Sequence, residues 1–174
     1  MSEKYQALRL VINNGQSPSA PSSPLWNRME DMSTAGHLPA FGHQYYCDDP
    51  KRFAKTRHYH GRLIYVLSGE LNVDLNVESL CVEAKSAIWI PAWLSHGLRV
   101  SEKTMFNAVY VHTLLMDYLP VSARRFGASP LLEQITNALA EVPMGAKITK
   151  RSRLLAAVMI DEIHASEITV GESV

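Results

Sequence analysis

Two stretches decide the fold of this chain: RHYHGRLIYVLSG at residues 57–69 and AIWIPAWLSH at residues 87–96. Each contains an apolar run of strand length, with a Gly or Pro turn signal beside that run. Side chains alternate between the two faces of an extended strand, so we expect His58 and His60 on the same face. If a later strand returns His96 to that face, three imidazole rings can converge on one small ligand or ion inside a barrel.

The segments around these stretches predict a mainly β domain. In Glu70–Leu75, apolar and polar residues alternate, which is typical of a strand with one buried face. Many short strands at close spacing, separated by turn residues, indicate a sandwich or a jelly-roll barrel. The expected strands are 39–46, 63–67, 71–75, 80–83, 87–90, 96–100 and 105–112, with a loop at 47–51 and a short ambiguous segment at 25–33.

The apolar period changes after Pro120, and the pattern then predicts a helical hairpin. Ser129 is a good N-cap, and Pro130 suits the first position of a helix. The apolar stripe of this first helix ends before Pro143. A second helix is expected over about residues 150–165. The apolar stripe of the first predicted helix consists of Leu132, Ile135, Leu139 and Val142.

The second predicted helix is apolar on more than one side. One face consists of Leu155, Val158, Met159 and Ile163, and Leu154 and Ile160 lie beyond it. A helix that is apolar on more than one side is buried on more than one side. We therefore expect a homodimer through this hairpin, unless the first helix covers the extra surface in a monomer. The expected dimerisation residues are Leu154, Leu155, Val158 and Ile160.

Length and composition support one domain with flanking segments. The chain has 174 residues and a formal net charge of zero, which gives no electrostatic reason to bind nucleic acid through this domain. No apolar run approaches the ~20 residues of a membrane span, and two cysteines suit reduced thiols in a cytoplasmic protein. The expected divisions are a flexible arm and Ser/Pro linker at 1–24, a barrel at 25–120, the hairpin at 121–166 and a tail at 167–174.

The two stretches resemble the metal-binding motifs of the cupin superfamily. His58-x-His60 followed by Gly69 is similar to the first motif, and Pro91-x-Trp93-x2-His96 is similar to the second. Three departures are clear: Trp93 replaces a glycine of the second motif, Val100 replaces its asparagine, and no carboxylate stands at the glutamate position of the first. Counting back from Gly69 places Arg62 at that position, whereas counting forward from His60 places Ile64 or Tyr65 there.

A closer resemblance, over roughly residues 36–165, is to the N-terminal effector domain of AraC-type transcription regulators. HGRLIYVLSG at 60–69, WIPAWLSH at 89–96 and SPLL at 129–132 resemble recurrent segments of that domain. The resemblance implies a cupin double-stranded β-helix with a C-terminal helical hairpin, a small effector in the barrel, and a dimer through the helices. In such regulators DNA is bound by two helix-turn-helix units C-terminal to this domain, and we expect DNA binding only through that absent half.

The chemistry of the site leaves alternatives open. The histidines His58, His60 and His96 either hold Zn or Ni, or line a pocket as hydrogen-bonding groups. Arg62 either faces inward and binds a carboxylate or other anion, or lies solvated at the rim after a bulge at Gly61. A small metal-dependent cupin enzyme, of dioxygenase or isomerase type, is the alternative to a sensing domain that is not an enzyme. The expected effector-binding residues are His58, His60, Arg62, Trp93, His96 and Tyr110.

Overall fold

The computed structural model describes residues 24–170, and the side chains of residues 24–166. The predicted arm at 1–24 therefore lies outside the described residues, apart from Pro24. The predicted tail begins later than expected, because helix α4 (Lys150–Val170) continues into it. Residues 171–174 lie outside the described part. Within that part, none of the helices combines the length and the hydropathy that a membrane span requires.

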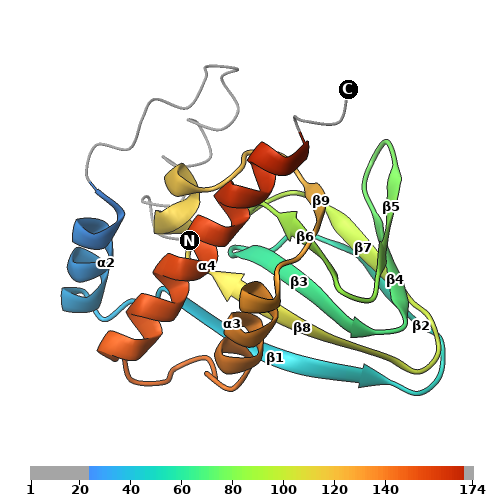
Figure 1. Ribbon diagram of the computed structural model, residues 1–174, viewed down its shortest axis with the longest axis horizontal. Coiled ribbons are helices and arrows are strands. Elements are labelled where there is room, and N and C mark those ends of the chain that lie inside the picture. Colours follow the sequence, from blue (N-terminus) through green and yellow to red (C-terminus); the bar gives the residue numbers. More distant parts are fainter. Residues whose placement is uncertain (1–23, 171–174) are drawn as a thin grey trace.

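Two antiparallel sheets make up the β-barrel (Figure 1). One sheet has five strands in the order β1-β8-β3-β6-β9, and the other has four in the order β2-β7-β4-β5. This confirms the predicted barrel followed by C-terminal helices. The strands are β1 (Ala40–Cys47), β2 (Lys51–Thr56), β3 (Gly61–Ser68), β4 (Glu70–Asp74), β5 (Ser79–Glu83), β6 (Ser86–Ile90), β7 (His96–Val100), β8 (Thr104–Val111) and β9 (Arg124–Gly127).

The helices gather on one side of the barrel, against the five-stranded sheet (Figure 1). Helix α3 (Pro130–Ala140) contacts β1, β8 and β3, and α4 packs on α3. Helix α2 (Leu25–Thr34) and the 3-10 helix η1 (Thr113–Tyr118) contact each other at the end of the helical layer.

Strand β3 lies at the centre of the larger sheet and is buried on both faces. Leu63 and Tyr65 point toward the helices, and Ile64 and Val66 point into the barrel. Because both faces are covered, the strand is a continuous apolar run rather than an alternating one. The barrel interior is filled by Ile64, Val66, Leu71, Val73, Val82, Ile88, Ile90, Leu98, Val100, Phe106 and Ala108.

Helix α3 begins where its sequence predicts. The Ser129 hydroxyl accepts a hydrogen bond of 3.1 Å from the Leu132 backbone N–H, and Pro130 occupies the first turn. Leu132, Ile135 and Leu139 are buried, as expected from the apolar stripe. The cap satisfies one of the N–H groups that a helix start leaves without a partner.

Three parts of the fold differ from the sequence predictions. Residues 25–34 form a full helix, whose Met29 and Met32 are buried. Strand β2 lies where no strand was predicted, because its sequence KRFAKT is polar and mostly exposed. Its pairing with β7 holds it in the sheet. Strand β9 pairs with β6, so the barrel extends past the predicted boundary at 120.

The buried face of α4 is also rotated relative to the prediction. Ala156, Met159, Ile160 and Ile163 are buried, whereas Val158 is 39% exposed and Leu154 is 45% exposed. The expectation that Ile160 lies on a dimer face is therefore wrong, whereas Leu154 and Val158 remain exposed. Helix α4 packs on α3 and also contacts α2, β1 and β9, and these elements together determine which face is covered.

Candidate functional site

Strand β3 places Arg62 inside the barrel. The pairing of β3 with β8 is continuous from Gly61 to Val66, so no bulge turns Arg62 outward. Arg62 shares its face with Ile64 and Val66, and it is only 8% exposed. Its guanidinium lies over the ring of Tyr110, at 5.3 Å from the ring centre.

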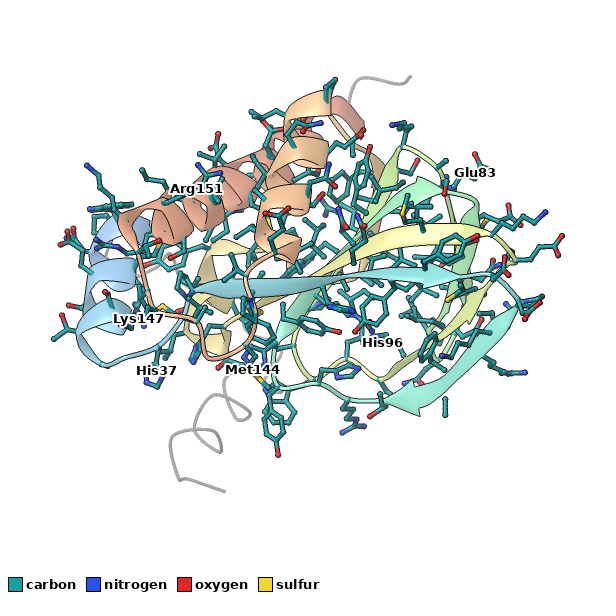
Figure 2. All side chains as sticks on the ribbon, turned by 90° about the horizontal axis from the view of Figure 1, so that it is seen from below. His37, Glu83, His96, Met144, Lys147 and Arg151 are labelled. Atoms are coloured by element: carbon teal, nitrogen blue, oxygen red, sulfur yellow. The ribbon has the colours of Figure 1, made fainter. Side chains whose placement is uncertain are left out.

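Strand β7 places His96 in the same interior. His96 is 3% exposed and lies within the barrel (Figure 2). It shares the inward face of β7 with Leu98 and Val100. Its Nδ1 lies 2.8 Å from the Leu94 carbonyl oxygen. A carbonyl oxygen only accepts, so Nδ1 carries the proton, and Nε2 presents a lone pair. This Nε2 is buried and has no hydrogen-bond partner.

Of the other two histidines in the predicted triad, one lies beside His96 and the other is directed elsewhere. The rings of His58 and His96 are 5.3 Å apart. The ring of His60 instead contacts Phe41 at 5.2 Å and His112 at 5.8 Å. Strand β3 begins only at Gly61, so the strand alternation expected for His58 and His60 does not apply. Among the side chains of residues 24–166, no group of three or more His, Cys, Asp or Glu is arranged to hold a metal ion.

The interior of the site combines one cation with neutral imidazoles. The pKa of His96 is lowered to about 4, mainly by burial and in part by the charges of Arg62 and His58. Burial also lowers the pKa of His58, with a further contribution from Arg62. Both rings are therefore neutral near pH 7. Among residues 24–166 no carboxylate forms an ion pair with Arg62, and its buried Nε has no hydrogen-bond partner.

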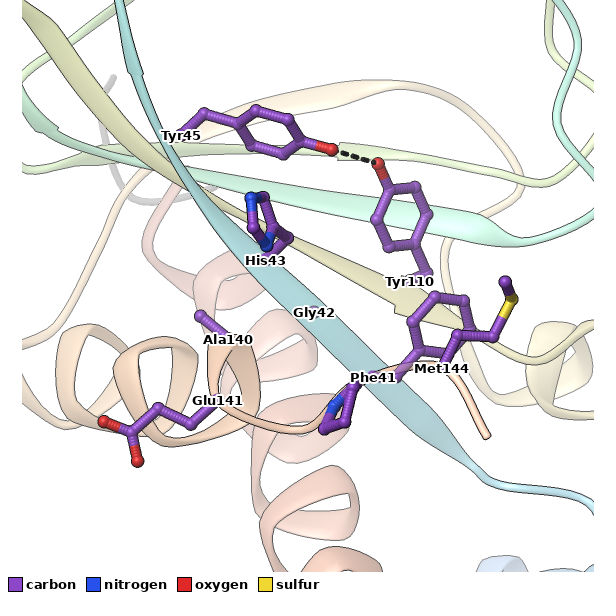
Figure 3. A pocket seen from close by; sticks show the side chains of 9 residues that line it. Phe41, Gly42, His43, Tyr45, Tyr110, Ala140, Glu141 and Met144 are labelled. Carbon is purple, nitrogen blue, oxygen red and sulfur yellow. Dashed lines mark hydrogen bonds between the residues drawn. The ribbon is translucent and has the colours of Figure 1, made fainter. Parts of the chain in front are cut away.

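A pocket of about 550 Å³ lies between β1 and the segment after α3, and neither Arg62 nor His96 belongs to its lining (Figure 3). Tyr110 belongs to its lining and also carries the Arg62 guanidinium over its ring. The hydroxyls of Tyr45 and Tyr110 lie 3.3 Å apart. Burial and this hydrogen bond raise the pKa of Tyr45 to about 12. The cavity is lined by Phe41, Gly42, His43, Tyr45, Tyr110, Ala140, Glu141, Pro143 and Met144.

Trp93 lies at the rim, next to Tyr59. The two rings meet edge to face with centroids 4.6 Å apart. The backbone N–H of Trp93 donates to the His58 carbonyl oxygen at 2.9 Å. The φ angle of Trp93 is +69°, the left-handed region that favours glycine. A glycine at this place would adopt the same backbone conformation without strain. Trp93 adds an aromatic wall there at the cost of local strain.

Sequence reasoning missed the wall that β1 contributes. Phe41, His43 and Tyr45 alternate along β1 and all three line the cavity. The ring of Phe41 stacks on Tyr110 with centroids 5.2 Å apart. The aromatic alternation was a visible signal, but the facing partners come from β8, more than sixty residues later in the chain.

Comparisons with known proteins bear on the fold. No family model matches the chain, and no curated protein matches it. Among solved structures, a cupin superfamily protein from Desulfitobacterium hafniense is 11% identical, with a TM-score of 0.40 over 42% of this chain and 68% of that chain. An RmlC-like cupin from Shewanella frigidimarina is 16% identical, with a TM-score of 0.40 over 43% of this chain and 68% of that chain.

A third structure is similar over more of the chain. It is a lysine-to-alanine variant of apo ToxT from Vibrio cholerae, an AraC-family regulator, at 9% identity and a TM-score of 0.55. The match covers 77% of this chain and 57% of that chain, so the present chain spans a little over half the length of ToxT. At this identity the likeness concerns the fold alone. The chain thus has a two-sheet β-barrel followed by C-terminal helices.

Proposed function

We propose that this chain is the small-molecule sensing and dimerisation domain of an AraC-type transcription regulator. The observation that carries the proposal is the barrel interior, where Nε of the buried Arg62 and Nε2 of the buried His96 lack hydrogen-bond partners, next to a pocket of about 550 Å³ that Tyr110 lines. Buried polar groups in proteins are almost always hydrogen-bonded, so such groups beside a cavity favour a ligand site. The fold likeness to ToxT supports the choice of regulator class.

The position of the cavity suits a sensor. Its lining combines Phe41 and Tyr110 of the barrel with Glu141 and Met144 from the segment after α3. A ligand in this cavity contacts the barrel and the helical layer together. It therefore shifts the equilibrium toward the arrangement of the two that it binds more tightly, which is the physical requirement for regulation.

The proposed dimer face lies on α4. Leu154 and Val158 are one helical turn apart and are 45% and 39% exposed. Leu155 is half-buried next to them, and Ile160 is buried within its own chain and takes no part. A two-fold partner presenting the same residues would cover this apolar pair.

Sedimentation velocity tests the dimer. Burying one such side chain stabilises by roughly 1.5–3 kcal/mol, so Leu154→Glu and Val158→Glu should each weaken association by at least about tenfold. Val77→Glu is the matched control, because Val77 is 93% exposed on the β4–β5 turn. A wild type that is monomeric at tens of micromolar, or α4 variants as dimeric as the control, would contradict the proposed interface.

Sensing and regulation are tested by measuring whether a ligand changes DNA binding. DNA contacts in this proposal belong to helix-turn-helix units C-terminal to the domain, so a fusion to such units should bind DNA in a ligand-dependent way. Stoichiometric iron in protein purified without a His tag, together with substrate-dependent oxygen uptake, would favour a metal-dependent cupin enzyme instead.

A further inference from the structure

We propose that the barrel ligand is a small hydroxycarboxylic acid, whose carboxylate binds Arg62 and whose hydroxyl donates to Nε2 of His96. This inference rests on the proposed function and specifies the class of its effector. Arg62 and His96 project into one interior from β3 and β7, and each carries a buried polar atom that has no partner within residues 24–166.

Arg62 determines the charge of the ligand. A guanidinium that is more than nine-tenths buried without a counter-ion is costly, and one that pairs with a carboxylate in a fork geometry is stabilised. No carboxylate among residues 24–166 supplies that pairing. The missing partner is therefore an anion from outside the chain, and a cationic ligand is disfavoured by the same charge.

His96 determines the second recognition group. The Leu94 carbonyl oxygen accepts a hydrogen bond from Nδ1–H of His96. The other nitrogen of this neutral ring, Nε2, can therefore only accept. A carboxylate oxygen cannot satisfy it, because both would be acceptors. The ligand must present a donor there, and a hydroxyl serves without adding positive charge beside Arg62.

Arg62 and His96 are both buried and face the same barrel interior, so one small molecule that carries an acid and a hydroxyl can contact both. Arg62 is close enough for its charge to lower the pKa values of His58 and His96. The ring of His58 lies 5.3 Å from that of His96 and contributes a second wall. The stacked rings of Phe41 and Tyr110 offer an aromatic surface for the rest of the ligand.

Titration calorimetry with the full chain tests this assignment. The probes are lactate, mandelate and 2-hydroxybenzoate, together with three analogues of mandelate: phenylacetate lacks the hydroxyl, mandelamide lacks the charge, and phenylglycine carries an ammonium group. At least one hydroxy acid should bind. We expect mandelamide, phenylacetate and phenylglycine each to bind about 10- to 100-fold more weakly than mandelate. The assignment is overturned if no hydroxy acid binds below 10 mM, or if mandelamide equals mandelate.

Variants assign the two contacts separately. Arg62→Gln should weaken every hydroxy acid about 10- to 100-fold, with Arg99→Gln as the control, because Arg99 is exposed and paired with Asp74 on the outer surface. His96→Phe should reduce mandelate to the affinity of phenylacetate and leave phenylacetate unchanged. Inorganic phosphate that binds more tightly than the carboxylates and competes with them would show a phosphate site and overturn the hydroxy-acid assignment.

The thermal stability of the ligand-free protein gives a readout that needs no ligand. If Arg62 has no partner in the free chain, Arg62→Met should leave the melting temperature unchanged or raise it, because it removes an unpaired buried charge. A fall in melting temperature of several degrees would show a structural role and overturn the assignment. A hydroxy acid that binds without changing dimerisation or DNA binding would leave this site intact and contradict the sensing role.

Discussion

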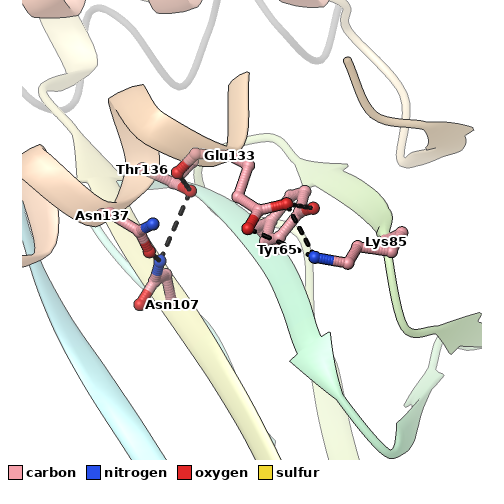
Figure 4. A network of polar contacts seen from close by, with 6 residues as sticks. All are labelled: Tyr65, Lys85, Asn107, Glu133, Thr136 and Asn137. Atoms are coloured by element: carbon pink, nitrogen blue, oxygen red, sulfur yellow. Dashed lines mark hydrogen bonds and ion pairs between the residues drawn. The ribbon is translucent and has the colours of Figure 1, made fainter. Parts of the chain in front are cut away.

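Tyr65 of β3 donates a hydrogen bond of 2.6 Å to Glu133 in the first turn of α3 (Figure 4). Tyr65 is 1% exposed, and Glu133 also accepts from Lys85 at 3.0 and 3.2 Å. Burial and the Glu133 carboxylate raise the pKa of Tyr65, so the phenol stays protonated and able to donate across the physiological range. The contact ties the start of α3 to the central strand of the larger sheet.

The Tyr65→Phe variant should lower the free energy of unfolding by about 1.5 kcal/mol. This is the lower end of the range for a hydrogen bond to a charged group, because Glu133 remains partly solvated and keeps Lys85. Urea denaturation measures the change. Tyr46→Phe is the control, since Tyr46 is 61% exposed and its bond to Asp48 lies at the surface. Equal stability of the two variants would contradict an anchoring role for Tyr65.

Asn107 of β8 forms a second polar link between the sheet and α3. It is fully buried, and it donates to Asn137 at 2.7 Å and to Thr136 at 3.4 Å (Figure 4). It also accepts from Gln44 at 3.0 Å. Removing one partner of a buried bond leaves the others unsatisfied. Asn107→Ala should therefore lower the free energy of unfolding by about 1–3 kcal/mol.

A double-mutant cycle of Asn107→Ala with Asn137→Ala isolates the shorter bond. Denaturation of the four proteins should give a coupling energy of about 0.5–1.5 kcal/mol between the two sites. Strict additivity of the single changes would mean that the bond between these amides does not contribute to stability.

Gly42 of β1 is required by the close approach of α3. A Cβ at this position would lie 2.9 Å from the carbonyl oxygens of Ala108 and Leu139, both of which are backbone atoms. Gly42→Ala should lower the free energy of unfolding by about 1–3 kcal/mol, the usual cost of overpacking. The control is Gly127→Ala in β9, where a Cβ would meet nothing within 4 Å.

The Gly127→Ala control should be neutral or should raise the free energy of unfolding by up to about 1 kcal/mol, because alanine reduces the conformational entropy of the unfolded chain. Thermal unfolding of the two alanine variants makes the comparison. If Gly42→Ala is as stable as Gly127→Ala, then α3 does not pack on β1 as closely as the structure shows.

Asp74 should give the protein an acid-dependent increment of stability. The hydrogen bonds from Arg99 and then Ser79 lower the pKa of Asp74 to about 2, from an ordinary value of 3.8. Since the folded pKa is the lower one, the increment is present above about pH 4 and is lost as the pH falls toward 2. The pair is near the surface, so its size is about 0.2–1 kcal/mol.

The measurement compares the wild type with Asp74→Asn in urea at pH 6 and at pH 2.5. The wild type should be more stable by the full increment at pH 6, and the difference should shrink at pH 2.5. A stability difference that is the same at both pH values would show that the carboxylate charge is not its source.

Most of the barrel was predictable because its signals are local. Strands β3, β4, β6 and β8 are apolar or alternating runs bounded by turn residues, and α3 starts at a Ser-Pro cap. Strand β2 carries no such signal. Its sequence is polar, and it is a strand only because the backbone of β7 pairs with it.

In the candidate site, too, some features follow from local sequence and others from tertiary packing. The sequence by itself determined most of the barrel and the first turn of α3, and it named Arg62 and His96 as candidates, because motif spacing and side-chain period depend on neighbours along the chain. It left the direction of Arg62 open, and the continuous pairing of β3 with β8 decided it. Only the tertiary structure decided the direction of His60, the aromatic wall of β1 and the buried face of α4. Each of these depends on which distant segment packs alongside, and burial is a property of the pair rather than of either segment alone.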